Sequence, residues 1–203
     1  MPGVASAGGS SGRDLAVNAD ADGTPSAGTT QNGYAPASFS SESLETEVGD
    51  TMSTFFTASA GTLLLCAYVP VAGASSGPFT EGAFVADRGG VLVASFSTAG
   101  VGVGIFDGAQ KTQTLACSTA AYHQIAMRWD NSNLKLRVDQ TDAANVAAGT
   151  ITSMTGRVVF AKNPGIAFLN YRLLDAATYA SAVSDAKLDE WREYYNTRYA
   201  LSL

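Results

Sequence analysis

The sequence predicts an all-β fold, a sandwich of two antiparallel sheets with an extended N-terminal arm and a short C-terminal helix. From Tyr34 onward, short runs of alternating apolar and polar residues are separated by turns rich in Gly, Asn and Asp. Of the 203 residues, 15% are charged and 46% are hydrophobic, a balance that favours strands and turns over exposed amphipathic helices. Because all-β sandwiches often reach this length as one unit, we expect a single domain over residues 34–203.

The arm is predicted from the composition of residues 1–33. These residues are almost wholly Gly, Ala, Ser, Thr, Asn and Asp, with Leu15 and Val17 as the large apolar exceptions. Such a segment cannot bury enough surface to offset the entropy lost on ordering. We therefore expect an extended low-complexity arm that is held by a neighbouring subunit or by another protein of a large assembly.

Strand-like runs then recur at spacings near ten residues, a rhythm typical of two packed antiparallel sheets. The predicted strands are Ala37–Ser43, Ser53–Thr57, Thr62–Pro70, Phe79–Ala86, Val91–Ser97, Val101–Phe106, Thr112–Cys117, Tyr122–Trp129, Leu134–Gln140, Gly156–Ala161 and Ile166–Leu174. Alternate glycines in the run Gly100–Phe106 predict a flat strand that another backbone approaches closely.

Helical periodicity is clear only at the end of the chain, over Ser184–Tyr199. Ser184 is suited to cap the helix, and Leu188, Trp191 and Tyr195 fall on one face, which should lie on the sandwich. A further helical turn near Asp175–Ala182 is a second expectation.

The stretch Tyr122–Asp139, YHQIAMRWDNSNLKLRVD, places two alternating runs on either side of a polar turn. It resembles the central hairpin of the concanavalin A-like jelly rolls, in particular the laminin-G-like domains found in adhesion and phage virion proteins. Those domains combine an aromatic-His start, an alternating strand, an Asp-Gly-Ser turn and a strand that ends near Val-Asp-Gly. The corresponding elements here are Tyr122–His123, Gln124–Trp129, Asp130–Asn133 and Leu134–Asp139.

The resemblance extends over roughly residues 34–199, because Phe55–Val69 resembles the first core strand and Leu173–Tyr199 resembles the last strand with its helix. It implies a jelly-roll sandwich. It implies no single function, since this scaffold hosts lectins, glycosidases, adhesion modules and virion proteins.

Catalytic chemistry is not expected. Glycosidases of this fold resemble one another in a strand with carboxylates at alternate positions. In SESLETEVGD only Glu45 and Glu47 share a face, and no third carboxylate continues the row. The single histidine, His123, is interpreted as a residue at the start of a strand that bonds the backbone, because one His and two separated Cys assemble neither a zinc site nor a Ser-His-Asp triad.

One short motif has the spacing of a metal-binding loop. Asn18, Asp20 and Asp22 precede Gly23 at alternate positions, as in the first half of a calcium loop, but Thr29 stands where the closing Glu would be. A polar turn is the preferred interpretation, and a weak calcium site is the alternative; no other cofactor is expected.

Cys66 and Cys117 lie in apolar runs and are expected to be buried thiols, with a disulfide as the alternative.

A glycan site would need exposed aromatic rings. Trp129 and Trp191 fall on faces predicted to be packed, which leaves Tyr194 and Tyr199 as the candidate ligand-binding residues.

Charge and apolar length exclude two classes of partner from the expectation, nucleic acids and membranes. A net charge of −6 and a sequence pI of about 4.6 argue against nucleic acid, and no apolar stretch is long enough to suggest a membrane partner. The N-terminus shows no basic segment followed by an apolar run, so we expect no secretory signal.

These features favour a non-enzymatic structural or decorating subunit of a phage virion, made in the host cytoplasm and anchored through residues 1–33 to a capsid or another virion protein. A capsid decoration or cement protein of this kind is expected to be a homo-oligomer. The alternative hypothesis is a glycan-binding adhesion module that recognises a surface polysaccharide.

Overall fold

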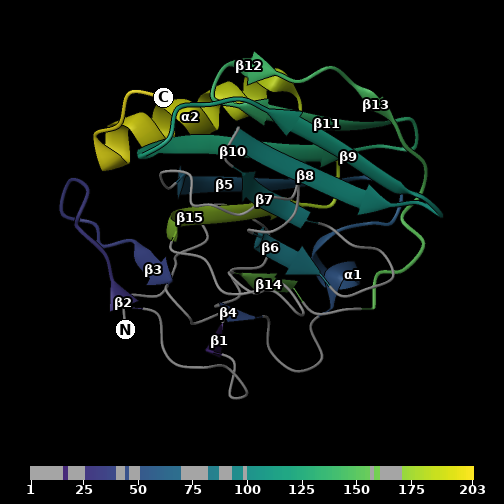
Figure 1. The fold of residues 1–203 in the computed structure, drawn as a ribbon, viewed down its shortest axis with the longest axis horizontal. Helices are drawn as coiled ribbons and strands as arrows, with labels where there is room; N and C mark the ends of the chain where they lie inside the picture. The colour runs from purple at the N-terminus through teal and green to yellow at the C-terminus, as the bar shows by residue number, and fades with distance from the viewer. Residues whose placement is uncertain are drawn as a thin grey trace.

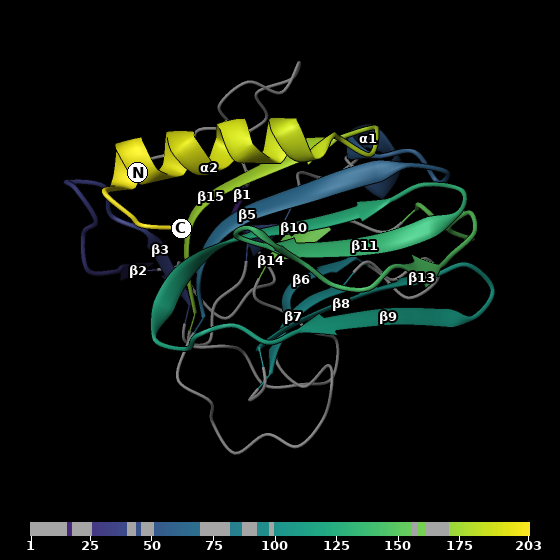
Figure 2. The same ribbon diagram turned by 90° about the horizontal axis from the view of Figure 1, so that it is seen from above.

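The computed structural model describes residues 16–17, 26–39, 44–45, 51–69, 82–86, 93–97, 100–155, 158–160 and 171–203. They build two stacked antiparallel sheets, and one long helix lies over the outer face of the second sheet (Figures 1 and 2). None of the helices in these ranges has the length and apolar character that crossing a membrane requires.

The first sheet, sheet A, has seven strands. In spatial order they are β1 (Ala16–Val17), β4 (Leu44–Glu45), β14 (Val158–Phe160), β6 (Gly82–Ala86), β7 (Val93–Ser97), β8 (Gly100–Phe106) and β9 (Gln110–Leu115). The predicted close approach at the glycine-rich strand is confirmed at Gly100, whose φ is +137° and where an added Cβ would lie 2.1 Å from the carbonyl oxygen of Leu115.

The second sheet, sheet B, has eight strands. In spatial order they are β12 (Thr141–Asp142), β11 (Asn133–Val138), β10 (Ala121–Trp129), β5 (Gly61–Val69), β15 (Tyr171–Tyr179), β3 (Ala37–Phe39) and β2 (Ser26–Ala27), while β13 (Val146–Ala147) also pairs with β11. Its centre is formed by β10 and β5, which are in register from Ala121 opposite Val69 to Trp129 opposite Gly61.

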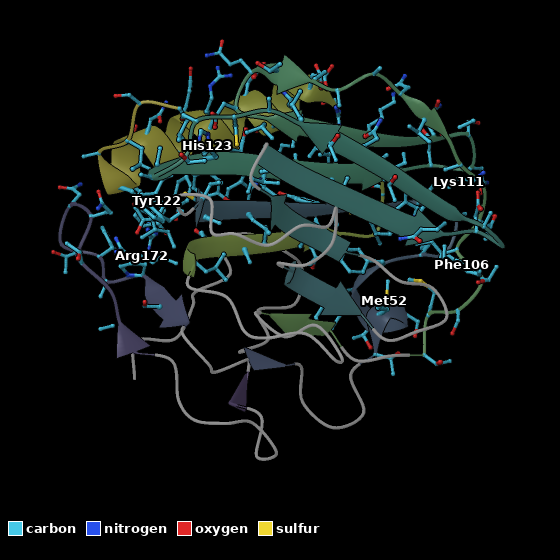
Figure 3. The ribbon with its side chains drawn as sticks, viewed as in Figure 1. Met52, Phe106, Lys111, Tyr122, His123 and Arg172 are labelled. Atoms are coloured by element: carbon cyan, nitrogen blue, oxygen red, sulfur yellow. The ribbon has the colours of Figure 1, made fainter. Side chains whose placement is uncertain are left out.

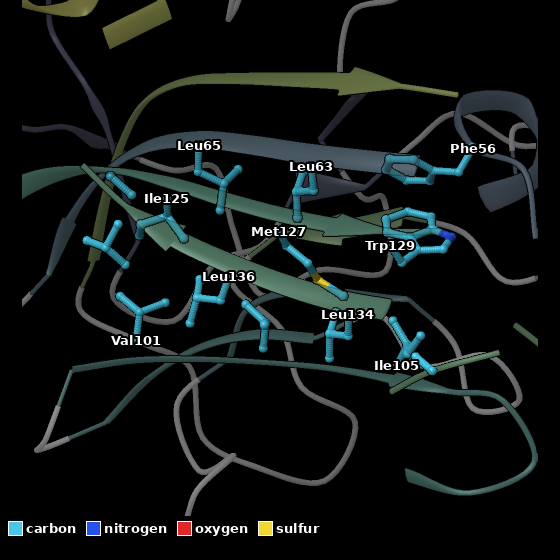
Figure 4. Packing of buried hydrophobic residues seen from close by; sticks show 14 of the residues in the cluster. Phe56, Leu63, Leu65, Val101, Ile105, Ile125, Met127, Trp129, Leu134 and Leu136 are labelled. Atoms are coloured by element: carbon cyan, nitrogen blue, oxygen red, sulfur yellow. The ribbon is translucent and has the colours of Figure 1, made fainter. Parts of the chain in front are cut away.

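The alternation of the central hairpin decides which side chains enter the core. Ile125, Met127 and Trp129 point between the sheets and are at most 1% exposed, as the period-2 pattern predicts. They pack with apolar residues of β5, β8 and β11, and Phe56 lies against Trp129 with ring centroids 5.0 Å apart (Figure 4). The hairpin is therefore the centre of the sandwich core.

The long helix α2 (Asp185–Tyr199) forms the third layer (Figure 2). Ser184 caps it by accepting a hydrogen bond from the backbone N–H of Lys187, as predicted. Leu188, Trp191 and Tyr195 are buried against the outer face of sheet B, which confirms the predicted apolar face.

Two local predictions are wrong. Ser53–Thr57, predicted as a strand, contains most of the short helix α1 (Met52–Phe55), because a helical turn brings both Met52 and Phe56 into the core. The helical turn expected near Asp175–Ala182 is replaced up to Tyr179 by β15, which pairs along its length with β5. Burial in the sheet outweighs the local preference in this segment.

The described parts of the predicted arm belong to the two sheets. β1 pairs with β4 at one edge of sheet A, and β2 pairs with β3 at one edge of sheet B. Elsewhere in residues 1–33, only the loop and turn after β2 are described. The role of the remaining residues as an anchor stays a prediction.

Both cysteines are free thiols. Cys66 is fully buried under α2, whereas Cys117 is half-buried against the core between the sheets. The expectation of two buried thiols is confirmed in full for Cys66 and in part for Cys117.

Candidate ligand-binding surface

Three side chains from neighbouring strands form a row across the outer face of sheet B. Tyr122 of β10 is the register partner of Tyr68 of β5, which is the register partner of Arg172 of β15. The guanidinium carbon of Arg172 lies 4.6 Å from the centre of the Tyr68 ring. The rings of Tyr68 and Tyr122 meet edge to face with centroids 5.3 Å apart. All three side chains are partly exposed, and Figure 3 labels Tyr122 and Arg172 near one another at one end of the sandwich.

The hairpin formed by β2 and β3 borders this row. Ser38 of β3 is the register partner of Arg172, and Gly28 lies against the Arg172 stem. A Cβ added at Gly28 would lie 3.4 Å from Cδ of Arg172 and 3.0 Å from Cγ of Pro36. The hairpin therefore supports the aliphatic part of Arg172 and leaves the guanidinium over Tyr68.

The tip of the same hairpin contacts the C-terminal end of α2. Asn32 and Gly33 have φ values of +47° and +82°, as a tight two-residue turn requires. The side-chain amide of Asn32 donates a hydrogen bond of 2.9 Å to the carbonyl of Arg198. The Arg198 guanidinium carbon lies 4.6 Å from the ring centre of Tyr34 and 5.5 Å from that of Tyr194. A second group of tyrosines around one arginine thus stands beside the hairpin.

Together these two groups make a surface that we call the tyrosine end. Its members are Tyr34, Tyr68, Tyr122, Arg172, Tyr194 and Arg198. Tyr34 is 43% exposed, and the other exposed large apolar side chain among the described residues, Phe106 at 36%, lies at the opposite end of the molecule (Figure 3). Tyrosine rings give large contact areas at a small cost in side-chain entropy, which suits them to ligand contact.

The two predicted ligand-binding tyrosines have different surroundings. Tyr194 is partly exposed, and its phenol oxygen accepts a hydrogen bond from Arg198. Tyr199 is only 3% exposed, and its hydroxyl is 3.1 Å from a carboxylate oxygen of Asp175. The expectation that Tyr199 is exposed is therefore wrong, because it continues the buried face of α2 one turn after Tyr195. A ligand contact by Tyr194 stays a prediction.

The predicted calcium ligands Asn18, Asp20 and Asp22 lie outside the described residues. Within the ranges that the structure describes, no three His, Cys, Asp or Glu side chains come together as a possible metal site. Of the paired glutamates, Glu45 lies in β4, whereas Glu47 also falls outside the described ranges.

His123 lies in a polar cluster at the start of β10. Its Nδ1 is 2.7 Å from a carboxylate oxygen of Asp139, and its Nε2 is 2.9 Å from the carbonyl oxygen and 3.2 Å from the hydroxyl of Ser118. The order Asp, His, Ser resembles a hydrolase triad, but an Nε2–H that donates to the carbonyl cannot take the hydroxyl proton. The cluster is a clamp between three segments, and the expected backbone bond of His123 is confirmed.

This clamp favours the protonated form of the histidine. Burial by itself lowers the pKa of His123, but the hydrogen bond and the negative charge of Asp139 outweigh it, so the pKa lies above its usual value. Asp139 also accepts a hydrogen bond of 2.9 Å from the backbone N–H of Gln124 through its other oxygen.

A second buried polar group lies beneath α2. Asp175 is 1% exposed, one of its carboxylate oxygens has no hydrogen-bond partner, and the other faces Tyr199. Burial raises the pKa of Asp175 to about 6, against the lowering effect of the Tyr199 hydrogen bond. Because this carboxyl is covered by the helix, it is no part of a surface site, and its ionised form is disfavoured where it lies.

The first half of α2 is fixed by ion pairs. Arg128 donates to Asp185 at 2.5 Å, and Arg137 donates to Asp189 at 2.8 Å. Gln124 donates a further hydrogen bond of 2.8 Å to the carbonyl of Leu188. These contacts are made by polar residues of β10 and β11 whose side chains point away from the core between the sheets. They explain why arginines occur at these strand positions beneath α2.

No protein-family model and no curated protein sequence matches the chain. Solved structures do match. The binding domain of botulinum neurotoxin serotype G is 8% identical, with a TM-score of 0.66 over 93% of this chain and 48% of that one. The LG4-5 domains of the mouse laminin alpha1 chain are 10% identical, with a TM-score of 0.54 over 81% of this chain and 48% of theirs. The fold is a concanavalin A-like jelly roll.

A third similar structure is that of domain 4 of AbnA, an extracellular arabinanase from Geobacillus stearothermophilus, in complex with arabinotriose. It is 9% identical, with a TM-score of 0.62 over 83% of this chain and 81% of that domain. The chain thus spans about half of the neurotoxin and laminin structures but most of the arabinanase domain. The jelly-roll resemblance predicted from the central hairpin is confirmed, and at these identities the likeness concerns the fold.

Proposed function

We propose that this jelly roll is a non-catalytic carbohydrate-binding module that holds a surface glycan at the tyrosine end. The observation that carries the proposal is the row of Tyr122, Tyr68 and Arg172, which are adjacent in register and partly exposed on three neighbouring strands. A ring with an apolar face and a polar hydroxyl suits a sugar, which also has an apolar face and polar edges.

Support also comes from the fold. The similar arabinanase domain was solved with arabinotriose, and the similar neurotoxin domain is named a binding domain. A small jelly roll with a rigid sheet beneath the ligand residues needs little rearrangement on binding, because strands hold side chains more firmly than loops do.

Binding to a glycan array tests the proposal. The wild-type protein should bind a defined set of glycans, and Tyr68→Ala and Tyr34→Ala should weaken that binding about tenfold, since aromatic contacts contribute on the order of 0.5–1.5 kcal/mol beyond the area they bury. Phe106→Ala is the matched control, because it removes an exposed aromatic ring at the opposite end of the sandwich. Equal losses in all three variants, or no glycan bound by the wild type, would refute the proposed function.

A second candidate function is a decorating subunit of a phage virion, anchored by its N-terminal arm. The composition of residues 1–15 supports it, since such a segment needs a partner surface to become ordered. β1 and β2 follow that segment and pair at the edges of the two sheets. An anchoring segment formed by residues 1–15 would therefore extend from a sheet edge.

The two candidates are separable by truncation. Deleting residues 1–15 keeps both β1 and β2, so the domain should fold and still bind glycan. If the arm is an anchor, the truncated protein will no longer attach to particles that the full chain decorates. Undiminished attachment of the truncated protein would exclude this second role.

A further inference from the structure

The arginines of the described part of the chain fall into two groups. Three of them pair with carboxylates around α2: Arg128 with Asp142 and Asp185, Arg137 with Asp185 and Asp189, and Arg192 with Asp189. Arg172 and Arg198, at the tyrosine end, have no carboxylate within ion-pair distance among the described residues. Among the described residues, these two guanidinium groups thus stand without a carboxylate partner in a protein of net charge −6.

Arg172 and Arg198 differ in how many contacts their guanidinium groups make with the described residues. The guanidinium of Arg198 lies among three tyrosine rings, those of Tyr34, Tyr194 and Tyr199, and it donates to the Tyr194 phenol oxygen. Arg172 is stacked on the ring of Tyr68 and faces the phenol of Tyr122, whose pKa is raised by burial and lowered by the charge and hydrogen bond of Arg172. Stacking uses the face of a guanidinium and leaves its N–H edge for an acceptor.

We propose that Arg172 receives an anionic group, a carboxylate or a sulfate, of an acidic oligosaccharide. This inference rests on the proposed glycan-binding function and names the class of glycan. An arginine edge offers two parallel N–H donors that match the two oxygens of a carboxylate or sulfate, and the resulting hydrogen bonds are stronger than neutral ones.

The surroundings of Arg172 hold it ready for such a partner. Its stem is supported by Gly28 and Ser38, and its plane is held against the Tyr68 ring, so few rotamers remain to be lost on binding. Tyr122, next in the row, meets the Tyr68 ring edge to face and has a buried hydroxyl, so it offers the sugar that carries the anion a ring contact rather than a hydrogen bond. A neutral glycan would gain from the tyrosines but would offer the guanidinium no negative charge.

The experiment compares acidic glycans with their neutral counterparts on one array. The probes are a galacturonate oligosaccharide and its carboxyl-reduced form, sialylated and desialylated forms of one glycan, and sulfated and desulfated forms of one galactan. The wild-type protein should bind at least one acidic member about tenfold or more tightly than its neutral counterpart. The uronate, sialyl and sulfate pairs show which anion is preferred.

The variants Arg172→Gln and Arg172→Lys then test the residue itself. Arg172→Gln should abolish the preference for the acidic member, whereas Arg172→Lys should keep part of it, because lysine retains the charge but not the paired donors. Lys111→Gln removes the same charge at the opposite end of the sandwich and should leave the preference unchanged (Figure 3). The comparison within the wild type needs no variant, so the proposal remains testable if a substitution prevents folding.

The outcomes separate the two proposals. Equal binding of acidic and neutral members overturns the anionic class but leaves the glycan-binding function standing. An acidic preference that survives Arg172→Gln overturns the role of Arg172 alone. If the wild type binds none of the probes, the glycan-binding function and the inference built on it both fall.

Discussion

Nδ1 of His123 lies 2.7 Å from a carboxylate oxygen of Asp139, and this contact joins the start of β10 to the residue that follows β11. Asp139 has a left-handed φ of +52°, so the backbone turns sharply where its side chain reaches back to the histidine. The clamp therefore fixes the two ends of the central hairpin, on which the core of the sandwich depends.

The clamp should make stability depend on pH in a defined window. The folded pKa of His123 is raised above its unfolded value of 6.5, so the stabilisation is complete below about pH 6.5 and is lost as pH rises through the higher folded value. We expect urea unfolding to show lower stability at pH 8.5 than at pH 6. Asp139→Asn should flatten this dependence, because it removes the carboxylate that favours the protonated ring. A slope unchanged in Asp139→Asn would show that the clamp does not cause it.

The buried carboxyl beneath α2 gives a second prediction, at lower pH. The pKa of Asp175 rises from 3.8 to about 6 on folding. The contribution of its neutral form to stability is therefore complete below about pH 3.8 and is lost as pH rises through about 6. Asp175→Asn removes the buried charge and should raise the free energy of unfolding at pH 8 by up to about 3 kcal/mol. At pH 4 the gain should vanish.

Asp142→Asn is the control for Asp175→Asn. It removes an equal charge, but Asp142 is 52% exposed and pairs with Arg128 at 3.4 Å, so its effect should be about 1 kcal/mol or less at either pH. If Asp175→Asn instead destabilises the protein equally at pH 4 and pH 8, its carboxyl is not the group that titrates near pH 6.

The two thiols should react at very different rates. Burial raises the pKa of Cys117 to about 11 and places that of Cys66 well above its usual value, and only Cys117 is partly exposed. At pH 8 a thiol reagent should label Cys117 slowly and should label Cys66 only after unfolding. The Cys117→Ser variant should therefore show no labelling in the native state. Rapid labelling of both thiols would indicate that α2 opens readily over Cys66.

The parts of the fold that follow from short-range periodicity could be predicted from the sequence. The central hairpin was identifiable because alternate residues from Ile125 to Trp129 are large and apolar, and α2 because Ser184 precedes a face of regularly spaced apolar side chains. The same spacing indicates that Tyr199 is buried, since it follows Tyr195 by four residues on the same helix face. The sequence therefore contains a signal against the expectation that Tyr199 is exposed.

The candidate surface could not be predicted in this way. Tyr68, Tyr122 and Arg172 come from strands far apart in the chain, and only the pairing of β10, β5 and β15 aligns them. Helix α1 was not predicted for a related reason. Its conformation is decided by the burial of Met52 and Phe56 and not by the β-favouring composition of Ser53–Thr57. Sequence patterns report what happens within one element, and both features depend on contacts between elements.

Gly61 carries the last prediction, since it stands opposite Trp129 in the pairing of β5 with β10. A Cβ added at Gly61 would lie 2.2 Å from Cζ2 of Trp129, a ring that is fully buried and packed on Phe56. Gly61→Ala should therefore destabilise the protein by about 1–3 kcal/mol or more, as overpacked cores do.

Denaturant unfolding of four variants checks this prediction. Gly149→Ala is the matched control, because its Cβ would lie 3.5 Å from Asp107, an ordinary contact, and it should cost about 1 kcal/mol at most. In a Trp129→Phe background, which removes the atom that the new methyl meets, Gly61→Ala should cost less than in the wild type. If the cost is the same in both backgrounds, the glycine is required for its backbone and not for the space that the tryptophan fills.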